Sequence, residues 1–300
     1  CGLGCYGAEH IHSPHIDALA ERGVRFERAY VQQAVCAASR ASFLTGCRPD
    51  TTTVSYPYNK YFTGTFLKSH PTIPRFFHEQ HYLCRGMGKL HHGPPLDMSP
   101  FPEPYYGGEK GTASYVLPSN QDKKPPTECA DVADEAYRDG QLAAEAVKTI
   151  RRWKDSGRSW CLGLGFHKPH LPFAAPKRYW DLYDRDGIEL SPGPELPDNV
   201  PFYAPATFEL PTYDGKLGTK DNPIDDDQAR LLRHGYFACT SFVDAQIGKV
   251  LKALDESGQR DRTVICFWSD HGWHLGDNGC WGKHTNFEWD THVPLIIRAP

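Results

Sequence analysis

Short apolar runs that end in glycine-rich turns alternate along the chain with segments of helical pattern. The apolar runs end near Cys84, Leu162 and Cys266, and helical patterns cover about 137–154 and 225–257. Strands and helices that alternate in this way are typical of α/β proteins. We therefore expect an α/β fold with a mostly parallel, mixed sheet sandwiched by helices.

The first and last residues of two helices can be predicted from capping residues. Ser13 and Pro14 open a short helix that Gly23 ends. A longer helix opens with the acidic turn Asp225–Asp227 and ends before Gly258. The apolar side chains of the longer helix form one stripe, which we interpret as core packing and not as a cofactor site. They are Leu232, Tyr236, Cys239, Val243, Ile247, Val250 and Leu254.

A cysteine lies at the expected start of a further helix. Cys36 follows a strand-like run over 24–31, and Gly46 gives the helix a stop. Backbone N–H groups at a helix start favour anions, and Arg40 lies one turn further along the same face. The pair predicts a nucleophile that acts on an anionic ester. The alternative is a buried structural cysteine beside a solvated arginine.

An acid and an imidazole stand side by side after another apolar run. Asp270 and His271 follow the stretch 263–266. In open α/β sheets, the carboxyl ends of strands gather ligand-binding groups. A carboxylate beside an imidazole suits a divalent cation such as Ca²⁺, with Mg²⁺ as the second choice. The alternative is an aspartate that caps the next turn beside a hydrogen-bonded histidine.

Lysine and histidine occur together in further turns. These turns are Gly86–Gly93, Gly163–His170 and Trp281–His284, and the first two follow short apolar runs directly. A single lysine or histidine in a loop is usually solvated. Three turns that each pair lysine with histidine are unlikely to occur by coincidence. We therefore expect these turns to lie together at one site with Cys36.

Composition excludes several classes of protein. The 300 residues can bury the core of one large α/β domain, and the net charge of −4 gives no basic surface for nucleic acid. The longest apolar runs are too short to span a bilayer. The 10 cysteines show neither a zinc-binding spacing nor a small disulfide framework, so no disulfide is inferred.

The sequence around the cysteine resembles the signature of the sulfatase family. Cys36–Arg40 fits the pattern C-x-[P/A]-S-R, with alanine in place of the commoner proline, and Leu44–Gly46 continues the match. Other segments are similar to the narrower group of iduronate 2-sulfatases and their bacterial relatives. They are Leu3–Gly7, Gln32–Val35, Ser42–Thr52, Gly165–Phe173 and Ser269–Trp273.

The resemblance implies an alkaline-phosphatase/sulfatase-like fold and a set of site residues. Cys36 would be converted to formylglycine by a formylglycine-generating enzyme and act as the nucleophile, with Arg40 as its stabiliser. Cys36 would also bind the cation, Ca²⁺ or Mg²⁺, together with Asp270 and His271. The groups around the sulfate would be Lys89, His167, Lys283, and either His91 or His92.

The same resemblance implies hydrolysis of a sulfated saccharide, with a 2-O-sulfated uronic acid as the expected substrate. Lys168, His170 or Arg48 would pair with the uronate carboxylate, and Trp273 would also contact the sugar. The alternatives are an arylsulfatase or choline-sulfatase activity, a phosphoester or phosphonate hydrolase, and an inactive glycan-binding relative. The family's usual location predicts an extracytoplasmic protein, with neither nucleic acid nor a membrane as a partner.

Two long segments, 94–126 and 192–218, lack periodicity and are rich in proline, glycine and tyrosine. Such loops in compact enzymes usually build the substrate site. Their tyrosines are therefore candidates to stack on sugar faces. They are Tyr105, Tyr106, Tyr203 and Tyr213.

The family pattern is incomplete at both ends of 1–300. Sulfatases carry two further metal-binding aspartates on a strand just before the segment that matches Leu3–Gly7, and a smaller domain after the segment that matches 293–300. We therefore expect a single catalytic domain that lacks its first strand and the smaller C-terminal domain. We also expect its cation site to bind Ca²⁺ weakly, because this cation prefers six to eight oxygen ligands.

Overall fold

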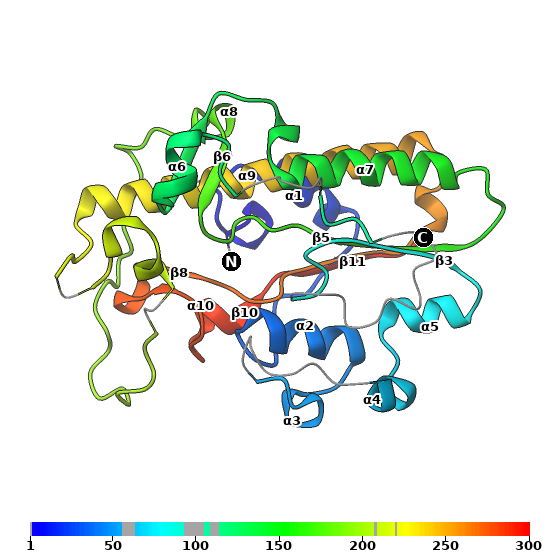
Figure 1. Ribbon diagram of the computed structural model, residues 1–300, viewed down its shortest axis with the longest axis horizontal. Helices are drawn as coiled ribbons and strands as arrows, with labels where there is room; N and C mark the ends of the chain where they lie inside the picture. Colours follow the sequence, from blue (N-terminus) through cyan, green and yellow to red (C-terminus); the bar gives the residue numbers. More distant parts are fainter. Residues whose placement is uncertain (1, 56–63, 93–104, 109–113, 207–208, 220) are drawn as a thin grey trace.

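The computed structural model describes residues 2–55, 64–92, 105–108, 114–206, 209–219 and 221–300 (Figure 1). The helices are α1 (Pro14–Glu21), α2 (Cys36–Thr45), α3 (Pro49–Thr52), α4 (Gly64–Ser69), α5 (Ile73–Glu79), α6 (Pro118–Lys123), α7 (Arg138–Trp153), α8 (Lys177–Trp180), α9 (Asp226–Glu256) and α10 (Glu288–Thr291). The strands are β1 (Val24–Arg25), β2 (Ala29–Tyr30), β3 (Leu83–Gly88), β4 (Thr127–Ala130), β5 (Trp160–Gly165), β6 (Phe173–Pro176), β7 (Ile265–Trp268), β8 (His274–Leu275), β9 (Trp281–Gly282), β10 (His292–Val293) and β11 (Leu295–Arg298). Short 3-10 helices lie at Gly4–Tyr6, Asp134–Ala136, Leu210–Thr212, Asp214–Lys216, Arg260–Arg262 and Asp277–Gly279.

The strands pair in both directions. β3 and β5 run parallel over their full lengths, and β4 and β6 are also parallel. β11 is antiparallel to both β1 and β7, and the pairs β2–β10 and β8–β9 are antiparallel too. Helices α7 and α9 lie on one side of β3, β5 and β11, and α2 and α5 lie on the other (Figure 1). The expected α/β class, with a mixed sheet between helices, is confirmed.

The expected majority of parallel strand pairs is not found among the described residues. β7 and β11 are separated by the β8–β9 hairpin and the short helix α10. A parallel return needs a crossover, usually a helix long enough to cover the sheet. No such helix lies between β7 and β11 in this described stretch, so the chain returns antiparallel.

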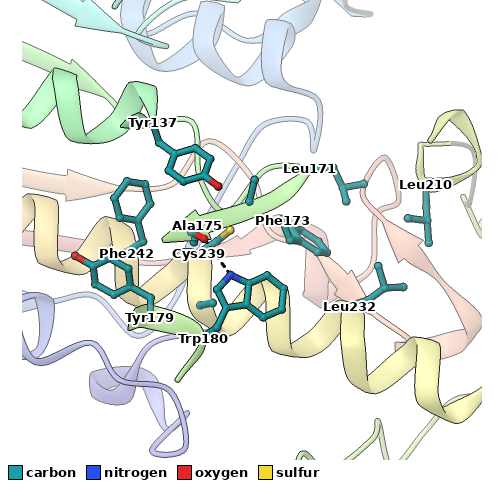
Figure 2. Packing of buried hydrophobic residues seen from close by; sticks show 12 residues of the cluster. Tyr137, Leu171, Phe173, Ala175, Tyr179, Trp180, Leu210, Leu232, Cys239 and Phe242 are labelled. Carbon is teal, nitrogen blue, oxygen red and sulfur yellow. Dashed lines mark hydrogen bonds between the residues drawn. The ribbon is translucent and has the colours of Figure 1, made fainter. Parts of the chain in front are cut away.

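Helix α9 organises the core. It spans 31 residues and begins with a capping box, in which Asp225 and Gln228 exchange side-chain-to-backbone hydrogen bonds. Leu232 and Cys239 of its predicted apolar stripe join one buried cluster, and Val243 joins another. Figure 2 shows the first cluster, where side chains from α8, α9 and β6 pack together. Full burial of one such side chain contributes roughly 1.5–3 kcal/mol, and the interpretation of the stripe as core packing is confirmed.

The ends of β3 and β5 meet at one edge of the sheet. The runs expected to end near Cys84 and Leu162 continue as strands to Gly88 and Gly165, which are directly paired. A Cβ atom built on Gly165 would lie 2.1 Å from the carbonyl carbon of Lys89. Glycine is therefore required for the close approach of the two chain segments. This approach brings the turn after β3 beside the turn after β5.

The long segments expected as loops hold little regular structure where they are described: α6 in the first and short 3-10 helices in the second. The hydroxyl of Tyr105 donates a hydrogen bond to the carbonyl oxygen of Gly88 at 2.6 Å. Tyr213 packs against the core cluster around α9. These two tyrosines serve the fold, whereas Tyr203 is 75% exposed.

The sequence predicts neither a membrane-spanning helix nor a disulfide. Within the ranges that the structure describes, no helix is long and apolar enough to cross a bilayer. The cysteines in those ranges carry free thiols.

Candidate active site

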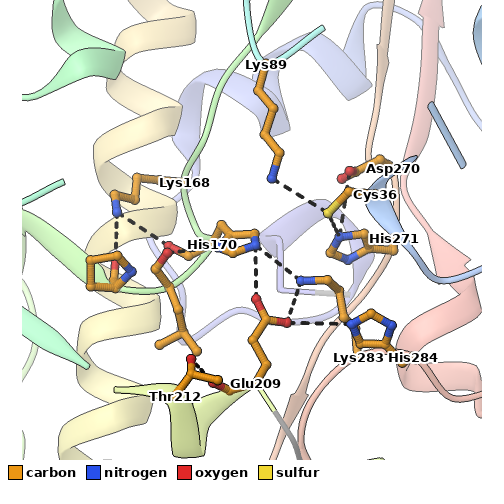
Figure 3. Close-up of polar contacts among 12 residues, drawn as sticks. Cys36, Lys89, Lys168, His170, Glu209, Thr212, Asp270, His271, Lys283 and His284 are labelled. Carbon is orange, nitrogen blue, oxygen red and sulfur yellow. Dashed lines mark hydrogen bonds and ion pairs between the residues drawn. The ribbon is translucent and has the colours of Figure 1, made fainter. Parts of the chain in front are cut away.

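Cys36 is the first residue of α2 and is surrounded by basic groups (Figure 3). Its Sγ lies 3.1 Å from Nε2 of His271 and 3.6 Å from Nζ of Lys89. Burial raises the pKa of the thiol, but the charge of His271 and hydrogen bonds from His170 and His92 outweigh burial and lower the pKa well below its usual value. The side chain therefore occupies an electropositive pocket of the kind that activates nucleophiles.

Arg40 lies one turn along α2, as predicted, and forms a buried ion pair. Its Nε is 2.8 Å from Oδ2 of Asp270, and the two side chains are 10% and 13% exposed. Burial raises the pKa of the Asp270 carboxyl, but the charges of Arg40 and His271 outweigh burial and lower it. Asp270 is therefore a carboxylate, and Arg40 is held in a fixed position beside Cys36.

Three predicted metal ligands lie together at the end of β7 and the start of α2. One ligand atom from each of Cys36, Asp270 and His271 lies within 4.8 Å of the others. A carboxylate oxygen and an imidazole nitrogen on adjacent residues fit one side of a cation site. Calcium takes six to eight ligands, mostly oxygens, so these side chains supply only part of its coordination.

A second cluster contains Lys283 and His170 (Figure 3). The Nζ of Lys283 lies 2.7 Å from Oε2 of Glu209 and 3.3 Å from Nε2 of His170. Nζ also lies 4.7 Å from the centroid of the Trp273 ring. Burial raises the pKa of the Glu209 carboxyl, but the hydrogen bond from His170 and the charge of Lys283 lower it to about 2. The cluster is therefore built around a charged carboxylate.

The two histidines after β5, His167 and His170, both line the cavity that Arg40 and Asp270 also line, but they have different partners. The backbone N–H and ring Nδ1 of His167 lie 2.9 and 3.3 Å from Oδ1 of Asp139. Its Nε2 lies 3.4 Å from Nη1 of Arg138. Asp139 thus anchors His167 to the first turn of α7. A hydrogen bond from His170 helps to lower the pKa of Cys36, after burial, which raises that pKa, and the charge of His271, which lowers it. Contact of His167 with the sulfate stays a prediction, and His170 is a further candidate for it.

Two of the cations expected to pair with a substrate carboxylate have different surroundings, because Lys168 lines the cavity at the site and Arg48 does not. The amine of Lys168 donates to the carbonyl oxygens of Pro172 at 2.5 Å and His170 at 3.4 Å. Burial lowers the pKa of Lys168, and its side chain points away from Cys36 in Figure 3. Arg48 is exposed beyond the end of α2 and does not line the cavity at the site.

The choice between the two adjacent histidines is decided by their neighbours. His92 forms a hydrogen bond that helps to lower the pKa of Cys36, after burial, which raises that pKa, and the charge of His271, which lowers it. His91 is 3% exposed, and its ring lies 6.0 Å from the ring of Tyr105. This hydrogen bond supports His92, and the identity of the histidine that contacts the substrate stays a prediction.

A cavity of about 660 Å³ adjoins these residues. Its polar wall includes Arg40, Lys89, Asp270 and His271, and its apolar wall comes from α1, α9 and β7. Ligand pockets of roughly 300–1,000 Å³ suit small molecules. The cavity therefore has room for a small molecule beside Arg40, Asp270 and His271.

Two acidic residues of the site were not found from the sequence. Asp139 lies in the first turn of α7, where an acidic residue is ordinarily explained by the helix dipole. Glu209 lies in a loop without periodicity, which gives no signal for its contacts. A long-range contact such as that between Glu209 and Lys283 cannot be read from either segment alone.

Comparisons with known proteins agree over almost the whole chain. The family model described as Sulfatase matches residues 2–300. Iduronate 2-sulfatases of Mus musculus and Homo sapiens are each 39% identical over 99% of this chain, which spans 57% of their length. The solved phosphonate monoester hydrolase of Silicibacter pomeroyi superimposes with a TM-score of 0.78 at 26% identity, covering 99% of this chain and 65% of that one.

Proposed function

Because this chain belongs to the sulfatase family, we propose that it hydrolyses the sulfate ester of a sugar, with position 36 as its nucleophile. The observation that carries the proposal is the set of basic groups that meet at Cys36, among them Lys89 and His271. A sulfate monoester is an anion and repels nucleophiles. Positive groups fixed around the point of attack stabilise the charge of the transition state.

Position 36 would act as formylglycine derived from Cys36. The hydrated aldehyde supplies one hydroxyl that attacks sulfur and a second whose deprotonation releases the sulfate. Asp270 and His271 would hold Ca²⁺ or Mg²⁺ beside it, and the cation adds positive charge there. Arg40 contributes a further fixed charge, because its ion pair with Asp270 prevents the guanidinium from turning away.

The remaining basic groups divide between the two ends of the ester. Lys89 and His92 contact position 36 and would hold the sulfate oxygens. Lys283 would give a proton to the leaving sugar oxygen. His170, whose Nε2 lies 3.3 Å from Nζ of Lys283, would help to orient that oxygen. His167 takes no direct part in this scheme, because Asp139 and Arg138 engage its ring.

The finer proposal is that the substrate is a 2-O-sulfated uronic acid in a polysaccharide or its oligosaccharides. Similarity to iduronate 2-sulfatases over 99% of the chain supports it. Of the cations expected to pair with the uronate carboxylate, Lys168 and His170 line the cavity and remain candidates, whereas Arg48 lies outside its lining. Trp273 lies beside His170, with the two rings 6.1 Å apart, and offers an aromatic surface to the sugar.

Hydrolysis of phosphonate monoesters is the second candidate. The TM-score of 0.78 with the phosphonate monoester hydrolase supports it, because both reactions transfer a tetrahedral anionic group. The same basic groups would stabilise either transition state. Only a direct comparison of substrates separates the two activities.

The test uses protein produced together with a formylglycine-generating enzyme. We expect faster release of sulfate from a 2-O-sulfated uronate disaccharide than from an aryl sulfate, and slower turnover of a phosphonate monoester. Peptide mass spectrometry and an aldehyde-reactive probe measure conversion at position 36, with Cys36→Ala as the matched control. Preference for aryl sulfates would remove the uronate assignment and keep the sulfatase assignment. Preference for phosphonates would replace both, and an active preparation that holds only thiol would exclude formylglycine.

A further inference from the structure

One carboxylate from a long loop holds both groups that the proposed reaction places at the leaving oxygen. Oε2 of Glu209 accepts a hydrogen bond from Nζ of Lys283 at 2.7 Å, and Oε1 lies 3.1 Å from Nε2 of His170. Each carboxylate oxygen therefore takes a different partner. Glu209 thereby sets the separation of the two nitrogens, which are 3.3 Å apart.

Lys283 is also confined by an aromatic ring. Its side chain is 3% exposed, and Nζ lies over the ring of Trp273. An ammonium group has three N–H donors. Within the part of the chain that the structure describes, Oε2 of Glu209 accepts from one of them, whereas Nε2 of His170 donates to the other oxygen of Glu209. The carboxylate of Glu209 and the ring of Trp273 therefore fix the direction of the ammonium group.

We propose that Glu209 is a positioning residue, which holds Lys283 and His170 in the arrangement that lets Lys283 protonate the leaving oxygen. Its ion pairs in the structure are with Lys283, His170 and His284, and not with Cys36. The chemistry of this inference rests on the proposed sulfatase function. The placement of Lys283 by Glu209 can be measured without that function.

If Glu209 positions Lys283, its loss should slow some substrates more than others. If Glu209 only stabilises the fold, its loss should slow all substrates alike. A sugar alkoxide is a poor leaving group and needs a proton as the S–O bond breaks, whereas a nitrophenolate leaves without one. Loss of an aligned Lys283 should therefore slow sugar sulfates selectively. A general loss of structure should slow both classes of substrate equally.

The first experiment compares kcat and KM of Glu209→Gln with those of the parent protein, both matured with the formylglycine-generating enzyme. We expect kcat on the sulfated sugar to fall about 100-fold and kcat on nitrophenyl sulfate to fall by less than about threefold, with KM little changed for both. Lys283→Ala should show the same selectivity. Glu209→Asp, which keeps the charge, should recover most of the loss.

Glu145→Gln is the matched control. It removes the carboxylate that lies 2.9 Å from Nη1 of Arg85, another largely buried ion pair. We expect this variant to affect the two substrates equally. Equal losses on both substrates in Glu209→Gln, like those of the control, would overturn the positioning role.

The second experiment measures Lys283 without any turnover. Acetic anhydride labels lysine amines, and peptide mass spectrometry resolves the rate at each position. We expect slow labelling of Lys283 in the parent protein and faster labelling in Glu209→Gln, while the half-exposed Lys177 labels equally in both. Unchanged labelling of Lys283 would overturn the proposal. Faster labelling in a protein that hydrolyses no sulfate ester would uphold the placement of Lys283 by Glu209 and reject the proposed function.

Discussion

Two buried clusters of charged residues in this molecule balance their charges differently. In the first, two carboxylates, Asp134 and Glu135, face two cations, and most of the donors serve Asp134. Lys249 and Gln246 of α9 lie 2.7 and 3.0 Å from its Oδ2, Tyr179 donates from α8, and Arg178 forms a further ion pair. The two cations in this cluster reach solvent with 40% and 54% of their side-chain surface exposed. This cluster joins α8 and α9 to the chain that enters α7.

The cluster around position 36 is not balanced in this way. Asp270 pairs with Arg40, and Glu209 pairs with Lys283. Lys89 contacts the thiol and has no carboxylate within ion-pair distance among the described residues. A cluster that stabilises the fold neutralises its charges internally, whereas the candidate active site keeps positive charge for an incoming anion. The following predictions test this difference, from the largest expected effect to the smallest.

Removal of the nucleophile should separate the two clusters most clearly. We expect Cys36→Ala to lower turnover of sulfate esters by about 10⁴-fold or more, because covalent catalysis is lost. The free energy of unfolding should change little, because the side chain is small and the ion pair of Arg40 with Asp270 remains. Steady-state kinetics and urea titration measure the two effects. Residual turnover within tenfold of the parent protein would show that position 36 is not the nucleophile.

The two histidines of the turn after β5 should have unequal effects. We expect His170→Ala to lower kcat about 10²- to 10³-fold, because His170 contacts both position 36 and Lys283. His167→Ala should lower kcat less than about tenfold and destabilise the fold by about 1 kcal/mol, since it loses hydrogen bonds to Asp139 and Arg138. Kinetics and thermal unfolding of both variants provide the measurement. The opposite ranking of the kcat values would favour His167 over His170 as the group at the sulfate.

These two histidines also show what the sequence could and could not predict. The strands that end near the site, the cap of α2 and the apolar stripe of α9 depend on local patterns, and all were predicted. The placement of His167 depends on Asp139, which lies 28 residues earlier in the chain and anchors the turn from α7. Glu209 likewise acts across a distance of 74 residues. Contacts between segments that are remote in sequence leave no pattern within either segment.

The Asp134 cluster should affect stability and not turnover. We expect Asp134→Asn to lower the free energy of unfolding by about 3 kcal/mol at neutral pH, because Lys249 and Arg178 lose their shared partner. Burial raises the pKa of Asp134, but the hydrogen bonds of Lys249 and Gln246 lower it below the usual 3.8. The stabilising effect is therefore present above the unfolded-state pKa and is lost as pH falls through the folded-state pKa.

Urea titrations of the parent protein and Asp134→Asn across this pH range give the measurement. The difference between the two proteins should stay constant from neutral pH down to about 4 and shrink below it. A difference that grows as pH falls would contradict the assignment of Asp134 as a stabilising carboxylate.

The smallest effect is expected at Arg48, which was considered from the sequence as a partner for the uronate carboxylate. Its side chain is exposed beyond the end of α2 and does not line the cavity beside position 36. We therefore expect Arg48→Ala to leave KM for a 2-O-sulfated uronate within about twofold of the parent value, since a solvent-exposed charge away from the ligand contributes little. His170→Gln is the matched comparison, because His170 is a candidate carboxylate partner that lines the cavity. A several-fold rise in KM for Arg48→Ala, confined to uronate substrates and absent for an aryl sulfate, would show that the sugar extends out of the cavity to α3.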